Sequence, residues 1–289
     1  MGMDLIQTLL DGLMVGGLYA TVAIGITLVF GIMSILNFAH GQMVMLGAYT
    51  AFFVVSAGFG FWPALLIAMV AMGALGLLME RLVFRHTLTD HMTGLTASLG
   101  LIMVIENLAA AAFTPDPRNF EPPLPGSFEI AGLTLSSQRM LVLGLVVVLV
   151  ASCYLFLQKT RIGKAIRAMG QNRTGAALVG IQITQVTAVV FALGSAMAGA
   201  AGVLYGSLFA ISPYMAAAPL MKGFILTVLG GLGSVPGAVL AGFLLGLAES
   251  LGSRYLSASF RDGYGFILMI VALLCFPTGL FGQRGKARV

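Results

Sequence analysis

The sequence predicts an all-α polytopic membrane protein with about eight to nine transmembrane or half-membrane helices. Hydrophobic residues make up 59% of the 289 residues and charged residues only 9%, whereas soluble domains carry roughly 25% charged residues. The 38 glycines fit this class, because glycine is more frequent in membrane helices than in soluble ones. No long polar block interrupts the chain, so we expect a single transmembrane domain over residues 1–289.

Charge and cysteine content narrow the expected partners. The net charge is +5, and in a membrane protein such an excess of Lys and Arg is typical of cytoplasmic loops. Cys153 and Cys275 both lie in apolar runs, which argues against a disulfide or a metal site. The opening residues, MGMDLIQTLLDG, contain no basic segment, so we expect the first apolar run to stay in the membrane. The sequence predicts a protein embedded in the lipid bilayer, with no metal, no cofactor and no nucleic-acid partner.

Eight apolar runs supply the expected membrane segments, several of them near the 20 residues or so that cross a bilayer. In chain order they are Leu5–Phe30, Gln42–Ala57, Trp62–Met79, Thr93–Phe113, Met140–Leu157, Val186–Ile211, Leu220–Ala248 and Tyr264–Phe276.

The first two runs are separated by a polar break too short for an ordinary exposed loop. It reads NFAHGQ and contains Asn37, His40, Gly41 and Gln42. We expect these four residues to line the substrate pathway or to form a hinge. For His40 the alternative is a capping residue bonded to free backbone groups, and both roles are compatible.

The polar gap 114–138 follows the fourth run and is rich in proline. Its mixed charge, with three acids, favours the external side. The segment Lys159–Arg173 carries five basic residues and no acid, and Arg81 and Arg85 lie two spans earlier. The positive-inside rule places all of these in the cytoplasm. The same rule favours a cytoplasmic C-terminus, because the tail contains Arg284, Lys286 and Arg288.

The basic insert 159–185 is too long for a tight turn. Its apolar residues Ile162, Ala165, Ile166 and Met169 follow helical spacing, and residues 174–179 can form a second short helix closed by Gly180. Two short cytoplasmic helices make a docking surface for a partner, and we expect the apolar stripe rather than the charge to make the contact. The alternative is an interfacial helix lying on anionic lipid.

The run Leu220–Ala248 contains the sequence GGLGSVPGA at its centre. We expect a broken helix or a re-entrant hairpin there, because Pro236 removes one backbone donor and three glycines precede it. The break comprises Gly230, Gly231, Gly233, Pro236 and Gly237. If this run forms two short helices, the basic C-terminal tail lies on the cytoplasmic side. If it forms one long kinked helix, the tail lies on the external side. A polar break in each half is typical of inverted-repeat transporters, so we expect a pseudo-inverted repeat, although the two breaks share no convincing residue identity.

Enzyme chemistry and ion coupling find little support in the residues. The chain has no phosphate-binding loop, no G-x-S-x-G and no H-E-x-x-H, so we expect no catalytic residues and no ATP site. Glu106 is the main ionisable candidate within a run, and a structural hydrogen bond is its alternative role. Lys222 lies near the start of its run and is expected to reach toward the surface. Several glycine pairs four residues apart predict close helix packing.

Four stretches together resemble a known family, in the same order along nearly the whole chain. They are NFAHGQMVMLGAY, TRIGKAIRAMGQNRTGAALVGI, GGLGSVPGA with residues 242–249, and FPTGLFG. The chain resembles the LivH-type permeases of bacterial branched-chain amino acid importers of the ATP-binding cassette class. The resemblance implies uptake of branched-chain or other hydrophobic amino acids across the inner membrane. It also implies a second, LivM-like permease, two cytoplasmic ATPases and an extracytoplasmic substrate-binding protein.

The resemblance also assigns the basic insert a role as the segment that seats in the ATPase. The residues expected to couple are Arg161, Gly163, Lys164, Arg167, Ala168, Gly170, Ala176, Ala177 and Gly180. Related permeases serve urea, short amides and sugars, so the same role for another small solute stays open. A stand-alone channel or secondary carrier is the main rival, and an integral-membrane enzyme is a further one.

Overall fold

The computed structural model describes residues 2–87, 90–121, 123–130 and 133–281, and the tail residues Arg284, Lys286 and Arg288 lie outside them. The helices are α1 (Gly2–Met33), α2 (His40–Ser56), α3 (Phe61–Leu82), α4 (His91–Phe113), α5 (Ser137–Lys159), α6 (Arg161–Gln171), α7 (Arg173–Leu178), α8 (Ile183–Gly206), α9 (Ala217–Gly230), α10 (Val235–Tyr255) and α11 (Arg261–Cys275). Two strands, β1 (Ser127–Ile130) and β2 (Leu133–Ser136), pair as an antiparallel hairpin.

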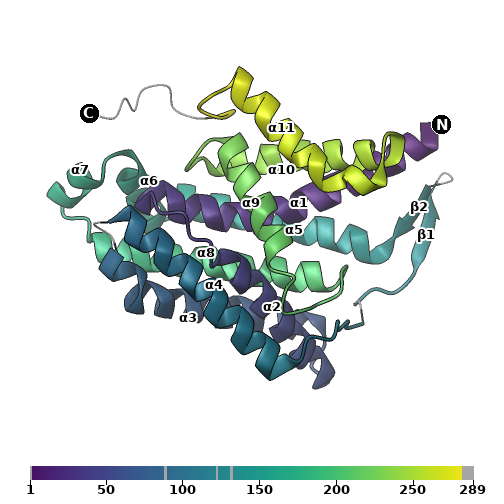
Figure 1. Ribbon diagram of the computed structural model, residues 1–289, viewed down its shortest axis with the longest axis horizontal. Coiled ribbons are helices and arrows are strands. Elements are labelled where there is room, and N and C mark those ends of the chain that lie inside the picture. Colours follow the sequence, from purple (N-terminus) through teal and green to yellow (C-terminus); the bar gives the residue numbers. More distant parts are fainter. Residues whose placement is uncertain (1, 88–89, 122, 131–132, 282–289) are drawn as a thin grey trace.

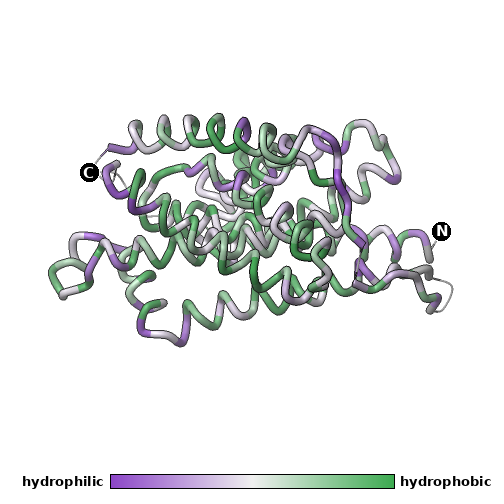
Figure 2. Tube along the Cα trace, turned by 90° about the horizontal axis from the view of Figure 1, so that it is seen from below, coloured by the Kyte–Doolittle hydropathy of each residue, from purple (hydrophilic) through white to green (hydrophobic). Residues whose placement is uncertain are grey.

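Seven helices in the described ranges are long and apolar enough to cross a membrane. Helices α2, with 17 residues, and α9, with 14, are shorter than the roughly 20 residues that a full span needs. The predicted all-α polytopic class and the number of membrane segments are therefore confirmed. Hydrophilic residues gather mainly toward the two ends of the bundle, as Figure 2 shows.

Glycines bring the helices into close contact. Helices α1 and α10 run antiparallel, and a Cβ on Gly16 would lie 2.5 Å from the Gly242 carbonyl oxygen. Gly12 faces Gly246 in the same way. Because a side chain at these positions would collide with backbone, the helices can pack this tightly only with glycine. The glycine pairs predicted to pack in α1 and α10 are confirmed.

Helices α1–α3 recur in the second half as α8–α10 with the direction reversed. Helix α3 packs along α8 much as α10 packs along α1. The short helix α2 lies on α8, and the short helix α9 lies on α1. Gly25 of α1 and Gly194 of α8 meet where the two halves cross. These reciprocal contacts form the predicted inverted repeat with broken helices.

The bundle has two distinct ends (Figure 1). Helices α6 and α7 project at one, which we call the α6–α7 end; the β1–β2 hairpin and the start of α1 lie at the other, the hairpin end. The loop before the hairpin is tied to the segment after α8 by a two-way backbone bridge between Arg118 and Ile211. The hairpin was not predicted from the sequence, where 114–138 reads only as a polar gap.

Candidate functional site

The two short helices begin next to each other inside the bundle. A Cβ on Gly41 of α2 would lie 2.8 Å from both the Ala216 carbonyl oxygen and the Cβ of Leu220 at the start of α9. Nearby, the rings of Phe38 and Phe224 pack with centroids 4.6 Å apart. We call this contact the half-helix junction. Two helix N-termini, each carrying partial positive charge, meet here.

The junction corrects the pairing of breaks expected from the sequence. The counterpart of the break 34–39 before α2 is the segment 207–216 before α9, because α2 and α9 occupy equivalent places in the two halves. The glycine-rich break Gly230–Gly237 lies elsewhere. Its Gly233 packs against Gly31 at the far end of α1. A Cβ on Gly31 would lie 3.0 Å from the Cα of Gly233. The break after α9 is thus at the α6–α7 end of the bundle.

The predicted polar residues of the first break take different roles. The Asn37 side-chain oxygen accepts a hydrogen bond from the Ala39 backbone N–H at 3.1 Å. His40 opens α2, is only 1% exposed, and its Nε2 has no hydrogen-bond partner. Its ring packs against Gly25, where a Cβ would lie 2.5 Å from Nε2. His40 also has a hydrogen bond with the backbone of Val22 in α1, while Asn37 makes the local backbone bond of the break.

Gln42 connects α2 to α4. Its side-chain Nε2 donates a hydrogen bond to the Glu106 carboxylate at 3.3 Å. This contact agrees with the structural hydrogen bond that was the alternative role for Glu106. The neighbouring Asn107 donates to the Met103 carbonyl oxygen on its own helix.

The helix is interrupted after α9 as predicted, and a later segment of the chain hydrogen-bonds to the end of α9. Gly231 and Gly233 have φ of 98° and 86°, a conformation that favours glycine, and Ser234 caps α10 by accepting from the Gly237 N–H at 3.2 Å. The backbone N–H groups of Leu280 and Phe281 donate to the carbonyls of Leu229 and Gly230. Helix α10, with 21 residues and Pro236 in its first turn, is long enough to span, which corrects the expectation of two short helices.

Helices α6 and α7 form where the insert predicted two short helices. Thr160 caps α6 by accepting from the Gly163 N–H at 2.9 Å, and Asn172 caps α7 by accepting from the Gly175 N–H at 2.9 Å. Polar side chains at these positions satisfy backbone donors that the helix start leaves free. Gly180 follows with φ of 85°.

Two residues of the apolar stripe of α6 face the protein itself. Ile166 and Met169 are only 4% and 3% exposed, which overturns the expectation that this stripe contacts a partner as a whole. Ile162 of the stripe is 44% exposed, and the most exposed apolar side chains of the insert lie at the end of α7 and just after it, where Leu178 is 84% exposed and Val179 is 77% exposed. We call Ala177, Leu178 and Val179 the α7 tip.

The remaining residues of the predicted coupling set divide by exposure. Arg161, Lys164, Arg167, Ala177 and Gly180 are exposed. The buried or partly buried members support the fold of the insert: Gly163 packs on the carbonyls of α5, Gly170 approaches the Gly31 carbonyl oxygen, Ala176 is 4% exposed and Ala168 is half-buried.

Sequence reasoning missed a charge cluster on α9, α10 and α11 that is centred on two buried residues, Lys222 and Glu249. Lys222 is 5% exposed and forms ion pairs with Glu249, which is fully buried, and with Asp262 at 3.0 Å. Arg261 Nε lies 3.6 Å from the Glu249 carboxylate, and the Tyr19 hydroxyl donates to it at 3.3 Å. Lys222 therefore does not reach toward the surface as expected. The signal in the sequence was Glu249, the first acid after Glu129.

A second buried carboxylate lies nearer the α6–α7 end. Glu80 of α3 is fully buried, pairs with Arg85 at 3.0 Å, and accepts a hydrogen bond from Thr187 of α8 at 3.3 Å. The contact fixes α3 to α8. Within the described residues no group of His, Cys, Asp and Glu has the arrangement of a metal site.

Inverted repeats with short helices that meet inside the bundle define this protein as a multi-pass membrane permease. The chain belongs to the family described as "Branched-chain amino acid transport system / permease component", whose family model matches residues 8–274.

Relatives from two bacteria cover nearly the whole chain. The high-affinity branched-chain amino acid transport system permease protein LivH of Salmonella typhimurium is 33% identical over 98% of this chain and 97% of its own length. The permease protein BraD of Pseudomonas aeruginosa is 32% identical over 98% of each chain. The permease protein LivM of S. typhimurium is 27% identical over 91% of this chain and 67% of its own length. No solved structure matches the chain.

Proposed function

We propose that this chain is one membrane subunit of an ATP-binding cassette importer for branched-chain or other hydrophobic amino acids. The projecting α6–α7 element is the observation that carries the proposal. It presents three exposed apolar residues, the α7 tip, beside the exposed basic side chains of α6. An apolar group with a charged rim is typical of a protein–protein contact. We propose that it seats in a cytoplasmic ATPase, and that the chain has no ATPase site of its own.

The proposed partners follow from this role. Two ATPases would bind the α6–α7 ends of two permease chains, and the similarity to both LivH and LivM supports a second permease of related fold. A substrate-binding protein would deliver the amino acid at the hairpin end. In this orientation residues 159–185 form the cytoplasmic coupling segment, residues 114–138 the external loop, and the C-terminus lies in the cytoplasm of a cell whose inner membrane holds the complex.

Movement would pass from α6 to the half-helices through packed glycines. Gly170 of α6 lies close to the Gly31 carbonyl, and Gly31 packs on Gly233 in the break after α9. A push on the α7 tip would therefore reach α1 and α9 together. The segments 34–39, 207–216 and 231–234 have no regular helix and would act as hinges, so that the half-helix junction opens alternately to the two sides.

Reconstitution in liposomes tests the proposal. Leucine uptake should require this chain, the second permease, both ATPases, the binding protein and internal ATP. Uptake by this chain alone would favour a channel or secondary carrier. Uptake of urea or a short amide in place of leucine would keep the ATP-driven role and change the solute.

A further inference from the structure

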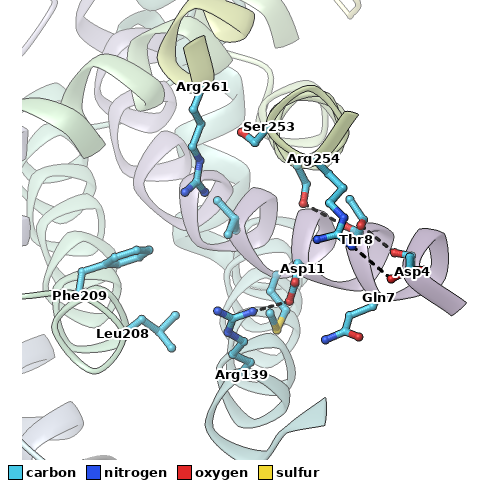
Figure 3. Close-up of a pocket in the computed structure, with 13 residues that line it drawn as sticks. Asp4, Gln7, Thr8, Asp11, Arg139, Leu208, Phe209, Ser253, Arg254 and Arg261 are labelled. Atoms are coloured by element: carbon cyan, nitrogen blue, oxygen red, sulfur yellow. Dashed lines mark hydrogen bonds and ion pairs between the residues drawn. The ribbon is translucent and has the colours of Figure 1, made fainter. Parts of the chain in front are cut away.

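A cavity of about 460 Å³ opens at the hairpin end (Figure 3). Its walls come from α1, α5, α10, the start of α11 and the segment after α8. The volume lies within the range of roughly 300–1,000 Å³ found for small-molecule pockets. The cavity is separate from the half-helix junction, the break after α9 and the α7 tip. We call it the hairpin-end pocket.

The pocket brings both signs of charge together. Three guanidinium groups and two carboxylates line it: Arg139, Arg254, Arg261, Asp4 and Asp11. Arg139 pairs with Asp11 at 2.6 Å and Arg254 with Asp4 at 3.2 Å. Because the side chains of Arg139 and Asp11 stay 50% and 34% exposed, this ion pair faces water and can exchange partners at little cost.

One wall of the pocket is apolar. Met14 and Val15 of α1 and Leu208 and Phe209 after α8 line it, and Figure 3 shows Leu208 and Phe209 across from Arg139. The pocket thus combines a cation, an anion and a hydrophobic surface within one small volume. A zwitterion with an apolar side chain has the same three features, whereas an inorganic ion or a purely apolar solute has one.

We propose that the hairpin-end pocket is a transient binding site for an α-amino acid with an apolar side chain. The inference rests on the proposed function and adds a site to it. Arg139 and Arg261 receive the α-carboxylate, since guanidinium groups bind carboxylates through paired donors. Asp11 receives the α-ammonium group. Met14, Val15, Leu208 and Phe209 contact the side chain.

The pocket also has a physical connection to half-helix α9. Arg261 lines the pocket and lies 3.6 Å from Glu249, which is ion-paired with Lys222 of α9. A substrate carboxylate that draws Arg261 toward the pocket would leave Lys222 and the Tyr19 hydroxyl as the partners of Glu249. Occupancy of the pocket would then change the charges that hold α9 to α10 and α11, which is a differential contact of the kind that a ligand needs to shift a conformation.

A cysteine probe in the apolar wall tests the site directly. Val15→Cys is introduced in the assembled transporter with Cys275→Ser, because Cys275 is exposed while Cys153 is buried. The probe is a small water-soluble maleimide, used without the substrate-binding protein and with the ATPases in each nucleotide state. Bound leucine should block the thiol. At a leucine concentration about ten times its dissociation constant, labelling should slow about tenfold, since only the empty fraction reacts.

Analogues and variants define the charge requirement. Leucinamide lacks the carboxylate and 4-methylpentanoate lacks the ammonium group, so neither should protect at concentrations where leucine does. Arg139→Gln and Asp11→Asn should each weaken protection by leucine. The matched control, Glu121→Gln, changes an exposed acid of the external loop that does not line the pocket and should leave protection unchanged. Cys275 in the otherwise native chain should label at the same rate with and without leucine.

Several outcomes would overturn the assignment. They are equal protection by all three compounds, no protection by leucine, no labelling of the Val15→Cys thiol in any nucleotide state, or, in a separate assay with the substrate-binding protein added, protection only by that protein. The last outcome would make the pocket a docking surface for that protein. ATP-driven uptake, measured in the same preparations, separates the two proposals: uptake without protection overturns the pocket alone, and protection without ATP-driven uptake overturns the proposed function alone.

Discussion

Lys222 and Glu249 form an ion pair in which neither side chain reaches bulk water: their side chains are 6% and 0% exposed. They belong to α9 and α10, which diverge from the break at Gly230–Gly237. Asp262 and Arg261 from α11 flank the pair. Four charged groups from three helices thus hold the half-helix α9 at a fixed place in the bundle.

Removing one charge of this pair should destabilise the protein more than removing both. Lys222→Met leaves a buried carboxylate with less compensation, which typically costs about 3–5 kcal/mol. In the double variant Lys222→Met with Glu249→Gln no charge of the pair is left buried, so part of this loss should be recovered. The midpoint of thermal unfolding in detergent measures both.

The control for this pair is Lys159→Met, at an exposed lysine at the end of α5, which should shift the midpoint little. Additive losses in the double variant would contradict a tight Lys222–Glu249 coupling, because independent sites add and interacting sites do not.

A side chain at Gly41 should disrupt the half-helix junction. The Cβ of Gly41→Ala would lie 2.8 Å from the Ala216 carbonyl oxygen, and backbone cannot move aside as a flexible side chain can. Overpacking of this kind costs about 1–3 kcal/mol. We expect a lower unfolding midpoint and slower ATP-driven uptake.

Gly100→Ala is the matched control for Gly41→Ala. Gly100 lies in α4 with nothing within 4 Å of the added Cβ, so alanine there should raise helix stability by up to about 1 kcal/mol. If the two variants shift the unfolding midpoint equally, the contact between α2 and α9 does not limit stability.

The sequence predicted the helices well, and the contacts between them poorly. Apolar runs and capping residues such as Thr160 and Asn172 act locally, so α6 and α7 follow from residues within a few positions. The Lys222–Glu249 pair depends on how α9 packs on α10, which no local pattern encodes. The break 207–216 was missed because its first half, with Leu208, Phe209 and Ile211, continues the apolar run of the helix before it.

The direction in which the α6 stripe faces shows the same limit. Spacing grouped Ile166 and Met169 on one face correctly, but it cannot say whether that face meets the protein or a partner. Both residues pack inward. Leu178 and Val179, which stay exposed, do not repeat at helical spacing and therefore gave no periodic signal.

The stability of the first turn of α4 should depend on pH in the acidic range. Asp90 accepts hydrogen bonds from Thr93 Oγ1 and from the Met92 N–H, and these bonds hold the pKa of its carboxyl below the usual range. A lowered pKa in the folded state means that the stabilisation is present above the ordinary carboxyl pKa, about 4. It is lost as the pH falls through the lower, folded value.

Hydrogen exchange of the first-turn amides of α4, measured by mass spectrometry, tests this pH dependence. Protection relative to the Asp90→Ala variant should shrink as the pH falls below about 4. Asp90→Asn keeps a capping oxygen without a titrating group, so its protection relative to Asp90→Ala should stay constant over the same range. An equal fall in the Asn variant would assign the effect to another group.

The α7 tip is where a single substitution should separate folding from partner binding. Leu178→Asp removes an apolar side chain that is 84% exposed, and Ala177→Arg adds bulk and charge beside it. Neither change touches a buried contact, so both variants should insert in the membrane and unfold at the native midpoint. If the tip is the contact that seats in an ATPase, both should lose co-purification of the ATPases and ATP-driven uptake.

Two further variants serve as comparisons for the α7 tip: one at a buried residue of α6 and one at an exposed residue outside the insert. Ile166→Ala deletes a buried side chain of α6 and should lower the unfolding midpoint, by about 2–5 kcal/mol in stability, while the protein that stays folded still binds the ATPases. Phe59→Asp, at a side chain 67% exposed in the loop between α2 and α3, should bind the ATPases normally. If Leu178→Asp retained both binding and uptake, the α7 tip would not be the coupling surface. If Ile166→Ala lost ATPase binding while keeping the native unfolding midpoint, the apolar stripe of α6 would be the coupling surface instead.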